Sequence, residues 1–132
     1  MGNKNKKIFD TIETLIGVGT TLTGDICVTG SLRVDGKIVG NIKNSGGVIV
    51  GDKAEIKGNI STEYIIVDGI VEGNITSGAG IELLNKAKVI GDIKTTILSI
   101  NEGAVFHGKS LMFEKEEVEN NDTNNNDDTK KK

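Results

Sequence analysis

Histidine and cysteine are the side chains of this sequence that could carry nucleophilic or metal chemistry, and each occurs once, as His107 and Cys27. A catalytic triad or a two-histidine metal site would have to be built around His107. This residue directly precedes a glycine of a repeated turn, where we expect a solvated side chain. No basic residue can be placed beside Cys27 to activate its thiol. The sequence therefore predicts no catalytic residue, no metal site and no cofactor.

Carboxylates recur along the chain, but without the pairing that acid–base chemistry needs. The pairs Asp35-Gly36 and Asp68-Gly69 lie two repeat units apart, and Asp-Gly is a common turn sequence. The formal net charge is −3, and residues 20–113 carry only −1 of it. A near-neutral domain lacks the basic face that binding to a phosphate backbone requires. The sequence thus predicts turn residues at the two aspartates and no nucleic-acid partner.

Composition restricts both the fold class and the compartment. The 132 residues include 18 Gly and no Pro or Trp, and aliphatic rather than aromatic side chains must fill the core. Such a composition disfavours helical bundles and aromatic-rich sandwiches and favours an all-β fold. The lone cysteine suits a reducing compartment. With no run of 18 apolar residues and no signal-like segment, we expect a cytoplasmic protein without a membrane span.

In place of a chemical site, the sequence contains a repeat. Glycine, then Asn or Asp, then Ile recurs at spacings of 15 to 18 residues. The copies are Thr23-Gly24-Asp25-Ile26, Val39-Gly40-Asn41-Ile42, Lys57-Gly58-Asn59-Ile60, Glu72-Gly73-Asn74-Ile75, Ile90-Gly91-Asp92-Ile93 and the degenerate His107-Gly108-Lys109-Ser110. Alternating apolar residues before each glycine, such as Leu32 and Val34, are typical of a strand with one buried face. The sequence therefore predicts about six copies of one β unit.

These units must stack, because a unit of about 17 residues cannot bury its apolar face alone. The architecture that results is a parallel β-helix, in which equivalent residues of successive coils form ladders. We expect the recurrent glycines at corners that need positive φ, and the Asn or Asp after each glycine in a stacked polar column. The connections between strands are of two kinds, short and long. They alternate along the chain until the last two coils, each of which has a long connection.

Two segments lie outside the predicted β-helix domain of residues 20–113. Residues 114–132 are acidic and Asn-rich, end in lysines, and are expected to be disordered. Residues 1–19 place apolar side chains at helical spacing, which suggests a short amphipathic helix over residues 8–16. This segment has two interpretations: a cap on the first coil, or a membrane-binding segment. The membrane-binding residues would be Lys4, Lys6, Lys7, Ile8 and Phe9.

The repeats of residues 20–113 resemble the bactofilins, a family of bacterial polymer-forming cytoskeletal proteins. The most family-like segments are Val34-Asp35-Gly36-Lys37-Ile38-Val39-Gly40-Asn41-Ile42 and Val67-Asp68-Gly69-Ile70-Val71-Glu72-Gly73-Asn74-Ile75. The resemblance implies a single-domain, right-handed, three-sided parallel β-helix of about six coils with flexible N- and C-terminal tails. It also implies nucleotide-independent, end-to-end assembly into non-polar filaments. The implied partners are a second copy of the chain, an anionic membrane surface and proteins that shape the cell envelope.

The two ends of such a β-helix are where self-assembly is expected. Each end leaves an open strand edge and exposed core side chains, and the sequence has no charged or proline-rich cap inside the repeat. The predicted polymer contacts are Leu22, Ile26 and Val28 in the first coil and Phe106, Leu111 and Phe113 in the last.

Two alternatives from other functional classes stay open at this point. The first is a left-handed β-helix acyltransferase, whose coils contain three hexads; Ile26, Leu32 and Ile38 fit that frame, whereas Asn44 and Thr62 break it. The second is a monomeric β-helix that displays one wall to a binding partner. Electron microscopy of the purified protein would distinguish the alternatives as filaments, compact trimers or single short rods.

Overall fold

The structure is a computed structural model that describes residues 12–113. Within these residues it contains sixteen β-strands and no helix, and hence no helix long and apolar enough to span a membrane. The strands are β1 (Thr14–Ile16), β2 (Thr21–Thr23), β3 (Ile26–Val28), β4 (Leu32–Val34), β5 (Lys37–Val39), β6 (Ile42–Asn44), β7 (Gly47–Val50), β8 (Glu55–Lys57), β9 (Ile60–Val67), β10 (Ile70–Glu72), β11 (Ile75–Leu83), β12 (Lys88–Ile90), β13 (Ile93–Thr95), β14 (Leu98–Ile100), β15 (Val105–His107) and β16 (Ser110–Met112).

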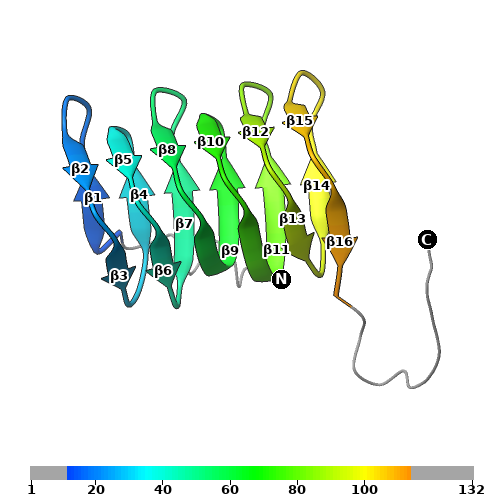
Figure 1. The fold of residues 1–132 in the computed structure, drawn as a ribbon, viewed down its shortest axis with the longest axis horizontal. Coiled ribbons are helices and arrows are strands. Elements are labelled where there is room, and N and C mark those ends of the chain that lie inside the picture. The colour runs from blue at the N-terminus through cyan, green and yellow to red at the C-terminus, as the bar shows by residue number, and fades with distance from the viewer. Residues whose placement is uncertain (1–11, 114–132) are drawn as a thin grey trace.

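The strands wind into a β-solenoid of six turns with three faces, which confirms the predicted fold class (Figure 1). Face A contains β1, β4, β7, the second parts of β9 and β11, and β14. Face B contains β2, β5, β8, β10, β12 and β15. Face C contains β3, β6, the first parts of β9 and β11, β13 and β16. All the pairings are parallel, so equivalent residues of successive turns lie directly above one another.

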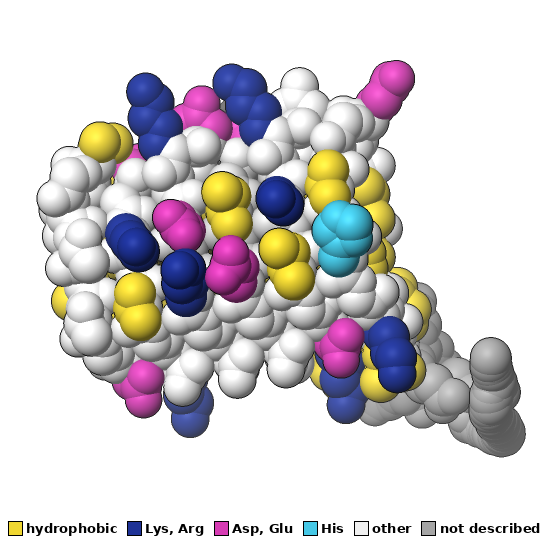
Figure 2. All heavy atoms as spheres, turned by 45° about the horizontal axis from the view of Figure 1, so that its top comes forward, with side chains coloured by type: hydrophobic (Ala, Val, Ile, Leu, Met, Phe, Trp, Pro, Cys, Tyr) yellow, Lys and Arg dark blue, Asp and Glu magenta, His cyan; other side chains and the backbone are white. Residues whose placement is uncertain are grey.

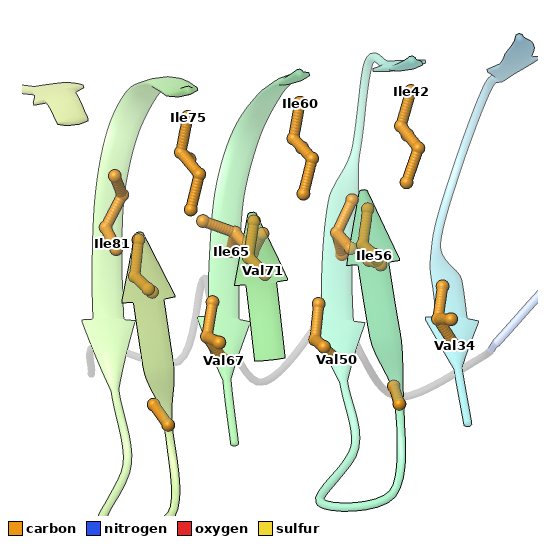
Figure 3. Close-up of a cluster of buried hydrophobic side chains, with 14 of the residues drawn as sticks. Val34, Ile42, Val50, Ile56, Ile60, Ile65, Val67, Val71, Ile75 and Ile81 are labelled. Atoms are coloured by element: carbon orange, nitrogen blue, oxygen red, sulfur yellow. The ribbon is translucent and has the colours of Figure 1, made fainter. Parts of the chain in front are cut away.

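Inward-facing aliphatic side chains form columns along the solenoid axis and make up the core. One column on face C contains Ile42, Ile60 and Ile75, and one on face A contains Val34, Val50 and Val67 (Figure 3). All six side chains are at most 2% exposed. Burying an aliphatic side chain of this size contributes about 1.5–3 kcal/mol. The stacking of turns, which each unit requires, therefore supplies the main stabilising free energy of the fold.

The Gly-Asn and Gly-Asp corners form between faces B and C, as the sequence predicts. Gly73 has φ 149°, and a Cβ at this position would collide with the backbone carbonyl oxygen of Gly58 in the preceding turn. Each Asn or Asp side chain accepts a hydrogen bond from the backbone N–H one turn further on. The Oδ1 atoms of Asp25, Asn41, Asn59, Asn74 and Asp92 accept from the N–H groups of Asn41, Asn59, Asn74, Asp92 and Lys109 at 2.9–3.1 Å. The predicted polar column is confirmed.

The corner between faces A and B is made by the two kinds of connection that the sequence contains. In the short kind, Asp68 N–H bonds to the carbonyl oxygen of Val50 in the turn before. In the long kind, four residues form a hydrogen-bonded turn. For example, Ala54 N–H donates to Gly51 O at 3.0 Å. Residues 17–20 of the first turn also form a long connection, through Thr20 N–H and Gly17 O. The long connections protrude as loops along one edge of the solenoid (Figure 1).

One inward column is polar, which the hydrophobic pattern did not predict. This column contains Asn44, Thr62, Ser77 and Thr95, each of which is at most 7% exposed. From the sequence, Asn44 and Thr62 were noted only as residues that break a hexad frame. Thr62 Oγ1 lies 2.8 Å from Asn44 Oδ1, and Ser77 Oγ lies 2.8 and 2.6 Å from the carbonyl oxygens of Glu63 and Gly80, one of which accepts its proton. These side chains satisfy backbone groups at the corner between faces C and A, where the chain bends out of the regular ladder.

The start of the chain differs from the expectation in one respect. Thr14–Ile16 is a strand that pairs with Leu32–Val34. The predicted amphipathic helix over residues 8–16 is therefore wrong for residues 14–16. Ile16 packs against the core, and Thr14 N–H donates to Ser31 O at 3.1 Å, so the strand ladder already begins before residue 20. The predicted membrane-binding residues Lys4, Lys6, Lys7, Ile8 and Phe9, and the tail of residues 114–132, lie outside the described residues.

This boundary leads to a testable prediction about the minimal folded unit. A fragment of residues 12–113 is expected to show a β-type circular dichroism spectrum and a cooperative thermal transition, because it contains all sixteen strands that the structure describes. A fragment of residues 18–113 lacks β1 and exposes the inward side of β4, so it should melt at a lower temperature. Equal melting temperatures for the two fragments would show that β1 contributes nothing to the fold.

Candidate polymer interface

The solenoid has two open ends, because the strands of its first and last turns pair on one side only. Within residues 12–113, β1, β2 and β3 pair only with β4, β5 and β6, respectively. In the last turn, β14, β15 and β16 pair only with β11, β12 and β13. Each end thus presents three strand edges with unpaired backbone N–H and C=O groups. Such edges favour pairing with another chain.

The C-terminal end face exposes the last side chains of the core columns. On face B, Phe106 continues the column of Val71 and Val89, both of which are 0% exposed. Phe106 packs against this core and is itself only partly buried, because no further turn covers it within residues 12–113. Ile100 on face A and Met112 on face C end their columns at 47% and 46% exposure. The end face is therefore an apolar patch surrounded by unpaired strand edges.

The N-terminal end face has the same construction with smaller side chains. Ile16, Leu22, Ile26 and Val28 occupy the first positions of their inward columns and are partly buried against the core. Their partners one turn further on, apart from the polar Asn44, are fully buried aliphatic residues. Both ends of the solenoid thus offer an apolar surface that spans the cross-section of one turn.

The predicted contact residues divide into two groups. Leu22, Ile26, Val28 and Phe106 lie at the ends of inward columns, at the open ends where the sequence analysis placed them. Leu111 instead points outward on face C, in register with Lys94, and is 58% exposed. Leu111 therefore lies on the side wall of the last turn rather than in the end face.

Phe113 also belongs to the side wall. Its ring lies 4.9 Å from Lys94 Nζ, a cation–π contact to the outer surface of the turn below. The predicted contacts leave out Met112, Ile100 and Leu98, which end the inward columns of faces C and A. The inward position of Met112 follows from counting two residues on from Ser110, because Ser110 and Met112 are aligned with the buried Ile93 and Thr95.

The remaining polar groups form no catalytic arrangement within the described residues. His107 and Cys27 are exposed on the outer wall, at opposite ends of the solenoid. Residues 12–113 contain no group of three His, Cys, Asp or Glu side chains that could hold a metal ion. Burial and the neighbouring Glu82 carboxylate raise the pKa of the Tyr64 phenol, which donates to Glu82 Oε1 at 3.4 Å. The hydrogen bond to Asp35 raises the pKa of Arg33.

The side walls are mixed in charge. On face B, basic and acidic side chains alternate with single aliphatic ones, and His107 marks the last turn (Figure 2). The outward residues of this face include Lys37, Glu55, Lys57, Glu72 and Lys88, together with Val39, Ile70, Ile90 and Val105. Scattered apolar residues among charges of both signs form no basic stripe and no large apolar patch. The outer wall of face B therefore offers neither an extended apolar surface nor a basic one.

Comparison with known proteins agrees with this geometry. The family model for bactofilin, described as polymer-forming cytoskeletal, matches residues 14–111. No curated protein matches the chain significantly. One similar solved structure is the cytoskeletal bactofilin BacA, determined by solid-state NMR: it is 32% identical over 76% of this chain and 96% of that chain, with a TM-score of 0.69.

A second similar structure is a cryo-EM reconstruction of double helical filaments of the Thermus thermophilus bactofilin. It is 26% identical over 76% of this chain and the whole of that chain, with a TM-score of 0.73. Because the family model covers nearly all of the solenoid and both solved structures share its fold, this chain belongs to the bactofilin family of polymer-forming cytoskeletal proteins.

Proposed function

We propose that this chain is a cytoskeletal scaffold subunit that polymerises through the two open ends of its solenoid. The observation that carries the proposal is the pair of uncovered core faces, where Phe106 and Leu22 end the same inward column. A second copy placed on either end would bury these side chains and pair the free strand edges. The membership in a polymer-forming family supports this function over an acyltransferase or a monomeric binding module.

Like ends meet in the proposed filament, C-terminal face to C-terminal face and N-terminal face to N-terminal face. Two-fold contacts of this kind are the commonest interfaces between identical subunits, and they make a filament without polarity. The contacts consist of apolar side chains and backbone edges, so assembly needs no nucleotide. The protein is a structural component rather than an enzyme. Negative-stain microscopy of the purified protein without nucleotide should show filaments; only isolated short rods at high protein concentration would contradict the proposal.

The cellular site in this proposal is the cytoplasmic face of the cell membrane, where the filament organises proteins that shape the envelope. Lys4, Lys6 and Lys7 precede the apolar Ile8 and Phe9 in the sequence. Near an anionic bilayer each lysine contributes about 1 kcal/mol, and shallow insertion of the two apolar side chains adds to it. A filament carries one such segment per subunit, so many weak anchors act together.

Membrane binding can be separated from polymerisation by changing the lysines. Replacing Lys4, Lys6 and Lys7 with Glu is expected to abolish sedimentation with anionic liposomes, because attraction becomes repulsion. Filaments should persist, since the end faces are unchanged. Replacing the three lysines with Arg is the matched control and should leave liposome binding intact. If the Glu variant still sediments with the liposomes as strongly as the unmodified protein, the basic segment is not the anchor.

A further inference from the structure

The hydrogen bonds of β3 show which of its backbone groups face the open N-terminal end. Ile26 N–H donates to Asn41 O at 2.9 Å, and Val28 O accepts from Ser45 N–H at 3.1 Å. Ile26 and Val28 therefore pair with the second turn. Because successive residues of a strand direct their backbone groups to opposite sides, the N–H and C=O groups of Cys27 face the open end.

The same reasoning identifies the free backbone groups of the other end strands. At the N-terminal end, the central residues of β1 and β3 face the open end, whereas in β2 the two outer residues do. The C-terminal end has the opposite pattern: the central residue of β15 faces the open end, and in β14 and β16 the two outer residues do. Within residues 12–113, the residues with free groups are Leu15, Thr21, Thr23 and Cys27 at the N-terminal end and Leu98, Ile100, Phe106, Ser110 and Met112 at the C-terminal end.

A contact between like ends makes the facing strands antiparallel. Each strand runs across the solenoid axis and follows the direction in which the chain winds (Figure 1). A two-fold axis perpendicular to the solenoid axis turns the second copy over, so that its chain winds the opposite way when viewed from the same side. The strand edges of the two copies can therefore join through antiparallel hydrogen bonds, which require residues with free groups to stand opposite each other.

A solenoid with three faces allows three such two-fold axes, each of which passes through the middle of one face and exchanges the other two. With the two-fold axis through face B, β1 pairs with β3 of the second copy, and β2 pairs with its own equivalent. Leu15 then stands opposite Cys27, and Thr21 stands opposite Thr23, so every free group meets another free group. A two-fold axis through face A or face C instead places Leu22, whose groups are bonded to the second turn, opposite Cys27 or Leu15.

The C-terminal end selects the same axis, although its pattern of free groups is the opposite one. With the two-fold axis through face B, the facing pairs are Phe106 with Phe106, Leu98 with Met112, and Ile100 with Ser110. The other two axes place Phe106 opposite Leu111 or Ser99, whose groups are bonded to the fifth turn. Rotating one copy by one residue does not correct this mismatch, because the strands that were matched then lose their register.

We propose that both end contacts of the filament are two-fold contacts whose axes pass through face B, with the strand edges joined in this register. The inference rests on the proposed function, because it specifies the geometry of the two polymer contacts. Inward side chains meet inward side chains across both contacts, with Leu22 opposite Leu22 and Phe106 opposite Phe106. Face B then continues along one side of the filament, whereas faces A and C alternate between neighbouring subunits.

Disulfide cross-linking of full-length chains in filaments tests the N-terminal register. Opposite residues of antiparallel strands lie about 4.5–5.5 Å apart between their Cα atoms, which is within the range of a disulfide. Under mild oxidation, Leu15→Cys should give a product of twice the chain mass on a non-reducing denaturing gel, because the introduced thiol meets Cys27 of the second copy. Leu15 and Cys27 are both exposed, so substitutions there leave the core intact.

Two matched controls distinguish the three axes. The unmodified chain should stay monomeric on the gel, and so should Leu15→Cys combined with Cys27→Ser. Dimers of the unmodified chain would place the two-fold axis through face C, and dimers of the combined variant would place it through face A. Either result, or no cross-link in any of the three chains, would overturn the register if microscopy shows filaments. Chains that form no filaments would refute the proposed function and the register together.

The C-terminal register is tested in the same way in a Cys27→Ser chain. Ser99 and Leu111 are exposed on faces A and C of the last turn and stand opposite each other in the proposed contact. Ser99→Cys combined with Leu111→Cys should therefore give the dimer on oxidation, and each single substitution should not. A dimer of either single variant, or no dimer of the double variant in filaments, would overturn the register at this end.

Discussion

Replacing Phe106 with arginine is expected to convert the filaments into a soluble, folded species no larger than a dimer. Phe106 ends the column that contains Val71 and Val89, and it is the largest apolar side chain of the C-terminal end face. In a two-fold contact the substitution is present twice, so two like charges meet in a surface that loses water. Such a juxtaposition costs several kcal/mol, enough to abolish the contact. The remaining N-terminal contact can join only two subunits.

The fold should survive this change, because an arginine at the open end can extend into solvent. Size-exclusion chromatography with light scattering measures the mass, and circular dichroism confirms the β-solenoid. Ile90→Arg is a matched control: Ile90 lies one turn from the end on the same face, points outward and is 40% exposed. This variant should still polymerise. Long polymers of the Phe106 variant would show that the C-terminal turn is not a contact, and a monomer at all concentrations would indicate head-to-tail assembly.

Val67→Asp is expected to abolish or nearly abolish folding. Val67 is 0% exposed, and it lies between Val50 and Leu83 in the middle of an inward column. A carboxylate at this position has no cation or hydrogen-bond donor among the aliphatic side chains above and below it. Burying an unpaired charge costs well over about 4 kcal/mol, a large fraction of the stability of a small domain. The loss should propagate, because each turn is stabilised mainly by its two neighbours.

Urea unfolding in the Phe106→Arg chain measures this effect without interference from polymers. Ile66→Asp serves as the control, since Ile66 is the next residue on the same strand but faces outward and is only half-buried. The control should lose far less stability than the Val67 variant. Comparable losses in the two variants would mean that the inward and outward faces of β9 have been misassigned.

Much of the solenoid follows directly from local features of the sequence. The spacing of the Gly-Asn and Gly-Asp pairs, such as Gly58-Asn59, placed five of the six corners between faces B and C, and the degenerate copy Gly108-Lys109 placed the sixth. A glycine with positive φ followed by a side chain that bonds to the next turn is a local requirement, so the residue types reveal it. Two-residue alternation predicted the buried sides of β4 and β7, because aliphatic and polar residues alternate there.

The sequence did not reveal the polar inward column or the first strand, because both depend on neighbouring turns. Asn44 and Thr62 are buried since they satisfy each other and backbone groups of a bent corner, and that corner exists only when turns are stacked. Residues 14–16 are too few for periodicity to distinguish a strand from the end of a helix. Their conformation is decided by the free edge of β4, to which they are bonded.

The last turn shows most clearly what the sequence alone determines and what only the tertiary structure decides. Leu111 is an apolar residue of the last turn and one of the predicted polymer contacts. Backbone pairing with β13 instead aligns Ser110 and Met112 with the buried Ile93 and Thr95. The repeat in the sequence determined that the chain forms a solenoid with open, apolar ends. Which side chains form those ends was decided by the hydrogen-bond register, because each turn takes its inward positions from the turn to which it is bonded.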